Sequence, residues 1–245
     1  MKTKLFTLTK NNLDLVNIKR TSNIIIPKSF IYNDTEFILH TIGFEVFSGW
    51  KELKSIILPN TIKIIEPKAF MDCINLKTIN IPQGLEKIEE KVFWNCERLK
   101  NLTFPENTRY LGDYLFFNCK RLETVNLPKR CKYLGGGTFT YCENLKTINL
   151  PEDLKHLRSY TFDNCKKISE IIIPNSVSGI EENAITKCLS LNEITLPDEP
   201  EYIESFAINN CPNIKNIIWK DFLYKHPSRL NIDLKKAGYT CDIWQ

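Results

Sequence analysis

The chain has 245 residues, of which 42% are hydrophobic and 25% are charged, and its formal net charge at pH 7 is +4. That charge is too small to indicate a nucleic-acid-binding protein. No apolar run approaches the roughly 18–20 residues that a membrane-spanning helix needs. The N-terminal residues lack the apolar segment of a secretory signal peptide, so the sequence as read predicts a cytoplasmic protein. A cell-surface or secreted protein is expected instead if the sequence begins after a removed signal.

Two β-hairpins are predicted at the start of the chain. The first spans residues 4–16, where apolar residues flank a Lys-Asn-Asn turn, and the second spans residues 30–42 around Asn33 and Asp34. A stack of coils needs closed or polar ends, because an open end would aggregate edge to edge. Residues 1–41 are therefore expected to form an N-terminal hairpin cap.

A 23-residue repeat organises residues 42–219. Each unit has a phenylalanine or isoleucine, a cysteine three residues later, then a leucine or isoleucine, and a closing proline. A period of 20–50 residues indicates stacked coils, so this segment is predicted to be a solenoid of about eight coils. The cysteines that mark the period are Cys73, Cys96, Cys119, Cys142, Cys165, Cys188 and Cys211.

The coil that begins at Cys73 contains one clear strand. Ile79 and Ile81 are expected to point inward and Thr78 and Asn80 outward, because side chains alternate along a strand. Pro82 cannot donate a hydrogen bond and ends the strand. Stacked strands of this kind would form a parallel sheet, here called the first wall. The return segments, here called the second wall, are expected to be extended or 3-10, and little helix is predicted.

The repeat resembles that of the BspA-like leucine-rich repeat family, whose signature Cys-x-x-Leu-x-x-Ile-x-Ile-Pro is spelled almost without change by residues 165–187. The resemblance covers about residues 42–219. It implies a mostly β, right-handed leucine-rich-repeat coil with a parallel sheet on one face. Known roles in the family are adhesion and protein–protein binding, so it also implies an adhesin or host-interaction role.

The regular pattern ends at Trp219, and residues 220–245 are predicted to form a C-terminal cap. Ser228 is placed to begin a helix that runs to about Ala237, and Gly238 would end it. Residues 239–244 are predicted to form a closing strand.

The sequence predicts no enzyme, no metal and no cofactor. The three histidines have no ligand or nucleophile partner at a diagnostic spacing. The cysteines recur once per coil, whereas zinc sites pair ligands two to four residues apart. The thiols, and Cys131 with them, are therefore expected to be reduced and buried as small hydrophobic groups. The run Gly135-Gly136-Gly137 lacks the lysine of a phosphate loop and indicates a tight turn.

The candidate binding residues lie on the second wall and the turns beside it. The 23-residue phase places aromatic residues in one outward column and cations in the next, and further rings stand at usually polar positions. Tyr, Trp and Arg are over-represented at binding hot spots, although the rings could instead stabilise the wall by packing across strands. The predicted partner-binding residues are Arg109, Tyr110, Lys132, Tyr133, Lys155, His156, Trp94, Phe117 and Tyr141.

The leading hypothesis is a monomeric, non-catalytic module that binds another protein along residues 88–167. A polyanion, nucleic-acid or carbohydrate binder using the same aromatic and basic residues is the alternative. An architectural segment of a larger assembly is a third hypothesis. On the first wall, the outward Ser, Thr and Asn side chains either hydrogen-bond along the sheet or form a flat surface for a partner.

Overall fold

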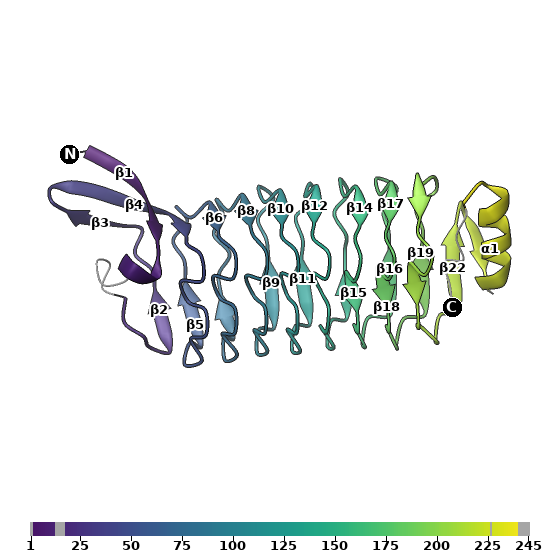
Figure 1. The fold of residues 1–245 in the computed structure, drawn as a ribbon, viewed down its shortest axis with the longest axis horizontal. Coiled ribbons are helices and arrows are strands. Elements are labelled where there is room, and N and C mark those ends of the chain that lie inside the picture. Colours follow the sequence, from purple (N-terminus) through teal and green to yellow (C-terminus); the bar gives the residue numbers. More distant parts are fainter. Residues whose placement is uncertain (1, 13–17, 226, 240–245) are drawn as a thin grey trace.

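The computed structural model describes residues 2–12, 18–225 and 227–239. The coils stack along one axis into an elongated solenoid, with a hairpin at one end and helix α1 (Pro227–Lys236) at the other (Figure 1). Among the described residues, helix is confined to α1 and the short 3-10 segment Lys10–Asn12. The predicted class, a mostly β solenoid of parallel coils, is confirmed.

The first wall consists of short parallel strands that lie one coil apart. In the coil of Cys73, Ile79 and Ile81 are buried and Thr78 and Asn80 are exposed, as the alternation predicted. The strands are β2 (Asn23–Ile25), β5 (Ser55–Ile57), β7 (Thr78–Ile79), β9 (Asn101–Thr103), β11 (Thr124–Asn126), β13 (Thr147–Ile148), β16 (Glu170–Ile172), β19 (Glu193–Thr195) and β22 (Asn216–Trp219).

The second wall is extended, which confirms one of the two forms expected for it. Most of its strands have only two residues, an outward one followed by a buried one. They are β4 (Thr35–Ile42), β6 (Ile64–Ile65), β8 (Lys87–Ile88), β10 (Tyr110–Leu111), β12 (Tyr133–Leu134), β14 (His156–Leu157), β17 (Gly179–Ile180) and β20 (Tyr202–Ile203). A third set of parallel strands occurs in later coils: β15 (Phe162–Asp163), β18 (Ile185–Thr186) and β21 (Ile208–Asn209).

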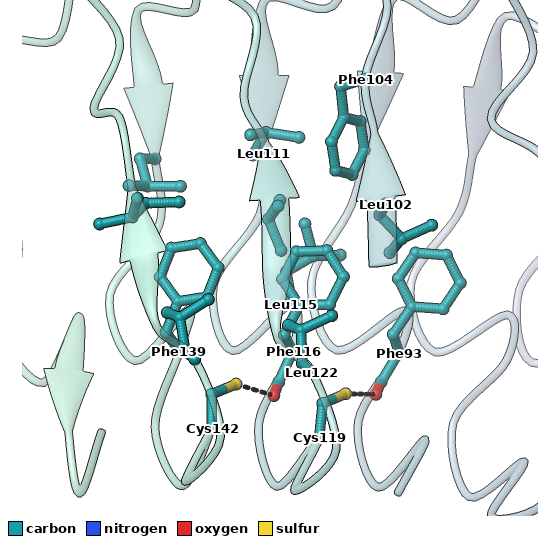
Figure 2. Close-up of a cluster of buried hydrophobic side chains, with 14 of the residues drawn as sticks. Phe93, Leu102, Phe104, Leu111, Leu115, Phe116, Cys119, Leu122, Phe139 and Cys142 are labelled. Carbon is teal, nitrogen blue, oxygen red and sulfur yellow. Dashed lines mark hydrogen bonds between the residues drawn. The ribbon is translucent and has the colours of Figure 1, made fainter. Parts of the chain in front are cut away.

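A column of stacked phenylalanine rings runs through the core. Phe93, Phe116 and Phe139 are fully buried, and their neighbouring ring centroids are 5.6 and 5.7 Å apart with nearly parallel planes (Figure 2). Because a single coil cannot bury both faces of its phenylalanine ring, the rings of the coils before and after cover it. The column therefore ties each coil to its neighbours.

The cysteine column lies beside these rings. The thiol of Cys119 donates to the carbonyl oxygen of Phe93 at 3.1 Å, and that of Cys142 to Phe116 at 3.2 Å (Figure 2). The described cysteines, Cys131 included, are buried and form no disulfide among themselves. Each cysteine of the 23-residue ladder is thus a small buried side chain that donates to one backbone carbonyl of the preceding coil, whereas the Cys131 thiol donates to Tyr133 in its own coil.

The N-terminal end is built on β4. Strand β3 (Ser29–Tyr32) pairs antiparallel with it around Asn33 and Asp34, whose φ angles are 47° and 56°, so the second predicted hairpin is confirmed. The first predicted hairpin is different: its first arm is β1 (Lys2–Leu8), which pairs in parallel with β4, and its second arm lies outside the described residues. Strand β4 also pairs with β6, so the hairpin and the first coil share one sheet.

At the C-terminal end, β22 turns back through an antiparallel pairing with β23 (Phe222–Tyr224), and α1 follows. The predicted helix and its glycine stop are confirmed: Gly238 has a φ of 95° and its N–H donates to Lys235 at 3.1 Å. Tyr239 donates from its hydroxyl to the carbonyl of Pro200 at 2.7 Å. The remainder of the predicted closing strand lies outside the described residues.

Candidate binding surfaces

The predicted aromatic column exists, but it is divided. Lys87, Tyr110 and Tyr133 lie opposite one another on β8, β10 and β12, and His156 lies in register with Gly179 and Tyr202 on β14, β17 and β20; these two runs belong to separate ladders. The column therefore contains two pairs, Tyr110 with Tyr133 and His156 with Tyr202.

The first pair is a tight stack capped by cations. The ring centroids of Tyr110 and Tyr133 are 4.4 Å apart, with planes 8° from parallel. Lys87 Nζ lies 4.7 Å from the Tyr110 centroid, and Arg158 Cζ lies 4.7 Å from that of Tyr133. Such cation–π contacts are favourable at the ring face. The rings thus stabilise the wall by packing on each other and on these two cations.

The cations predicted to lie beside the rings, Arg109 and Lys132, do not cover them. Each lies one residue before a ring, in the neighbouring column, and is exposed. Successive side chains of an extended chain point in different directions, so the cation does not lie over the ring that follows it. Arg158, which the sequence analysis missed, lies two residues after His156 in the same coil. The only signal for it was that other coils mostly carry glutamate or glycine at that position.

A carboxylate holds the Tyr133 hydroxyl. That hydroxyl donates to Asp113 Oδ1 at 3.2 Å, and the Gly136 N–H donates to the same oxygen at 2.9 Å. Burial, followed by the negative charge of Asp113, raises the pKa of Tyr133 to about 12. Burial also raises the pKa of Tyr110, with Glu89 adding to the effect. Both phenols are therefore neutral at physiological pH and can act as hydrogen-bond donors.

The residues of the second pair lie two coils apart, and the coil between them has glycine at this position. The hydroxyl of Tyr202 lies 3.2 Å from Nδ1 of His156, across Gly179. A Cβ at Gly179 would lie 2.2 Å from Cζ of the Tyr202 ring, so only glycine leaves room for the ring. The contact joins residues two coils apart.

The cation column beside the rings is unpaired. Arg109, Lys132 and Lys155 are exposed, and none of them forms an ion pair within the described part of the chain. One coil earlier the same column holds Glu86, which pairs with Lys63 at 3.2 Å. Like charges that face each other on neighbouring strands are destabilising. The fold therefore gains nothing from this run of three cations.

The remaining predicted rings, Trp94, Phe117 and Tyr141, form a separate group on the turns together with Tyr114; this group is here called the turn cluster. Trp94 stacks on Phe117 with centroids 3.8 Å apart, and Phe117 meets Tyr141 edge-on at 5.5 Å. Tyr114 contacts both Trp94 and Phe117. No ring contact joins the turn cluster to Tyr110 or Tyr133 in the described structure, so the predicted residues form two groups.

Three tyrosines on the turns combine exposure with a left-handed backbone. Tyr114, Tyr141 and Tyr160 are 36%, 38% and 44% exposed, and their φ angles are 54°, 59° and 59°. The same left-handed backbone recurs at these turn positions in the other coils, for example at Lys91 and Asn95, so it belongs to the turn of the repeat. What distinguishes the three positions is the large exposed ring that each carries. Gly137 also accommodates the cluster, because a Cβ there would lie 2.3 Å from Cε1 of Tyr114.

On the first wall, the outward polar residues hydrogen-bond along the sheet. Thr124 donates to Asn101 Oδ1 at 2.7 Å, and Asn126 Nδ2 donates to the Thr103 hydroxyl at 3.0 Å. The first of the two expectations for these columns is therefore confirmed, and these side chains have a structural role.

Two features are absent from the residues that the structure describes. No group of three or more His, Cys, Asp or Glu side chains among them is arranged to hold a metal ion. None of their helices is long and apolar enough to cross a membrane.

The stacked coils define a β-solenoid of the leucine-rich-repeat class. The sequence matches the family described as BspA type leucine rich repeat region, in 6 copies, over residues 16–146 and 113–229. The chain belongs to this family. A search of curated proteins finds no match.

Solved structures agree with the fold. A leucine-rich repeat protein from Bacteroides ovatus is 27% identical with a TM-score of 0.53, and the alignment covers 80% of this chain and 63% of that one. The T. pallidum leucine rich repeat protein is 20% identical with a TM-score of 0.56, covering 92% of this chain and 87% of that one. A leucine-rich repeat protein from Eubacterium ventriosum is 19% identical with a TM-score of 0.56, covering 89% and 66%. The chain thus spans less than two thirds of the Bacteroides ovatus protein.

Proposed function

We propose that this chain is a non-catalytic protein-binding module whose partner lies along residues 88–167. The observation that carries the proposal is the run of Arg109, Lys132 and Lys155, three exposed cations in successive coils that form no ion pair within the described part of the chain. The full contact set comprises Arg109, Tyr110, Lys132, Tyr133, Lys155, His156, Trp94, Phe117 and Tyr141.

The turn cluster supplies the apolar part of this surface. Tyr141 is exposed, and the stacked Trp94 and Phe117 are half-buried, so a partner can cover them at little ordering cost. Rigid aromatic side chains of this kind are the usual anchors of protein interfaces. The expected partner surface combines acidic side chains, which meet the cation column, with an apolar patch, which meets the rings. An adhesin-like role follows if the chain is exported.

The alternative partner is a single-stranded nucleic acid or another polyanion. Cations in register beside aromatic rings are the feature that favours it, because such surfaces bind the backbone and stack the bases. Binding to a polyanion weakens steeply and linearly as log salt increases. Titration with a labelled homopolymeric oligonucleotide at several salt concentrations therefore separates this function from protein binding.

The test compares two triple variants with the same change in charge. One removes the cation column (Arg109→Gln, Lys132→Gln, Lys155→Gln), and the other removes three first-wall cations (Lys77→Gln, Arg98→Gln, Arg121→Gln). Partners are captured from the native lysate with each protein, and unfolding is measured in urea. The column variant should lose the partner that the wild type captures while its stability is unchanged or increased, because repulsion is removed.

Tyr141→Ser provides a test of the turn cluster. It removes an exposed ring from a turn position, so the fold should tolerate it within about 0.5 kcal/mol. If the ring anchors a partner, capture should weaken by about 2 kcal/mol, which is the size of a hot spot. The proposal is wrong if the column variant and Tyr141→Ser both retain the partner, and the first-wall variant alone loses it.

A further inference from the structure

The first wall is interrupted between strands β7 and β9, and likewise between β13 and β16. Strands β7 and β9 belong to separate ladders, and no hydrogen bond of the sheet joins them. In the adjacent coils, the Lys77 N–H donates to Lys54 at 2.8 Å and the Glu123 N–H to Lys100 at 2.8 Å. The corresponding bond from Lys100 to Lys77 is absent from the described structure. We call this opening the seam.

Two side chains on the β7 side of the seam are slightly more exposed than their counterpart in the coil before. Ile79 is 9% exposed and Ile81 8%, whereas Ile56 in the coil before is 1% exposed. Asn80 turns away from the seam, and its amide pairs with both backbone groups of Leu58 at 2.7 and 2.8 Å. Strand β7 and the Asn80 side chain after it thus hydrogen-bond to the coil before, whereas β7 forms no sheet hydrogen bond with β9 in the coil after it.

The seam forms a cleft with a volume of about 750 Å³. This lies within the roughly 300–1,000 Å³ typical of small-molecule sites. Four of its lining side chains are cationic and one is anionic. The residues that line it are Lys77, Thr78, Ile79, Arg98, Lys100, Asn101, Arg121, Glu123 and Asn144.

The single carboxylate does not neutralise the cleft. Glu123 is bound by Lys100 at 3.1 Å and by Lys146 at 2.9 Å, so its charge is already compensated. Lys77, Arg98 and Arg121 form no ion pair or side-chain hydrogen bond within the described residues. Three cations therefore surround the cleft without an anion of their own.

The two arginines replace a residue that has a clear structural role elsewhere. At the same position of other coils, Asn75 donates to the carbonyl of Lys51 at 2.8 Å, and Asn144 donates to that of Lys120 at 2.6 Å. Arg98 and Arg121 occupy this position in successive coils and make no such bond. Neither arginine therefore has the backbone partner that asparagine has at this position.

We propose that the seam cleft binds the phosphate or sulfate group of a small anionic ligand, held between Arg98 and Arg121 with Lys77 at its side. Guanidinium groups present paired N–H donors that match such oxyanions in geometry and charge. Thr78 and Asn101 supply hydroxyl and amide groups for the neutral part of the ligand, and Ile79 forms an apolar floor. The site is on the first wall and shares no residue with the protein-binding surface.

Calorimetric titration of the whole chain with pyrophosphate and with sulfate at low ionic strength tests the proposal. Arg98→Gln with Arg121→Gln should weaken binding at least about tenfold, because two charge-assisted hydrogen-bonding groups are lost. Arg130→Gln with Lys167→Gln is the matched control: it removes two exposed cations that line neither the cleft nor the protein-binding surface, and it should leave the affinity unchanged. Melting temperatures establish that both double variants are folded.

Two ligands distinguish the sources of the oxyanion. Tighter binding of glucose 6-phosphate than of inorganic phosphate indicates a phosphorylated ligand, and tighter binding of glucosamine 6-sulfate than of inorganic sulfate indicates a sulfated one. The proposal is overturned if the anions bind no better than chloride at matched ionic strength. It is equally overturned if both double variants lose affinity alike, or if a triglutamate peptide binds more tightly than every oxyanion.

Discussion

Replacing Phe116 with alanine tests whether the coils stabilise one another through the ring column. Phe116 is fully buried, stacks between Phe93 and Phe139 at 5.6 and 5.7 Å, and meets Phe104 edge-on at 6.2 Å. Truncation of a buried phenylalanine costs about 3–5 kcal/mol. Each aromatic pair adds about 0.5–1.5 kcal/mol beyond burial, so three pairs place Phe116→Ala at the upper end of the range.

Phe47→Ala is the matched variant at the N-terminal end. Phe47 is also fully buried, but among the described residues it forms only two aromatic pairs, with Phe70 at 5.2 Å and with Trp50 at 5.1 Å. One fewer pair should lower the cost by about 1 kcal/mol. Urea unfolding followed by circular dichroism measures both. An equal or larger loss at Phe47 would refute a stack in which each coil depends on two neighbours.

Two further predictions follow from the buried thiols and from Gly179. Burial raises the pKa of Cys73 from 9.0 to about 12 and that of Cys131 to about 11. Because the folded protein holds these protons more tightly than the unfolded chain, the resulting contribution to the free energy of unfolding is complete below pH 9 and is lost as pH rises towards 12. The loss is up to about 1.4 kcal/mol per thiol per pH unit. Urea unfolding from pH 8 to 11 should show this decline, and a flat profile would contradict it. Gly179→Ala should cost about 1–3 kcal/mol, because the Tyr202 ring must move away from the new Cβ and from His156. Adding Tyr202→Ala should restore part of that loss in a thermal melt, and no restoration would contradict the steric reason.

The 23-residue phase predicts which residues share a column, because every coil repeats the same path. The register of Tyr110 with Tyr133, and the burial of the phenylalanine and cysteine ladders, follow from counting along the sequence. The same count predicted the exposed cation column correctly in position. Spacing alone was therefore sufficient for the path of the regular coils and for which side chains point inward or outward.

Side-chain contacts that reach across coils could not be predicted from the period. The pairing of Arg158 with Tyr133, and of Tyr202 with His156, depends on side-chain rotamers that reach across one or two coils. The split between the turn cluster and the Tyr110–Tyr133 pair arises in the same way. The seam was also not visible in the sequence. Both β7 and β9 match the repeat, and nothing in the repeat shows that the backbones of these two strands do not hydrogen-bond to each other.

A solenoid repeats each position at one spacing, so a like-charged column is a systematic cost, and this chain mostly avoids it. Along one column Glu97, Lys120, Glu143 and Lys166 alternate in sign, with ion pairs of 3.1 Å from Lys120 to Glu97 and 2.9 Å from Lys166 to Glu143. Where the charges of a column do not alternate in sign, their presence needs another explanation. Two such runs are the second-wall cation column and the arginine pair at the seam. Each stands next to a feature that a partner could use, exposed rings in the first case and an open cleft in the second. Neutralising either run should therefore stabilise the free protein while weakening its binding, and a variant that loses both stability and binding would show that the charges serve the fold.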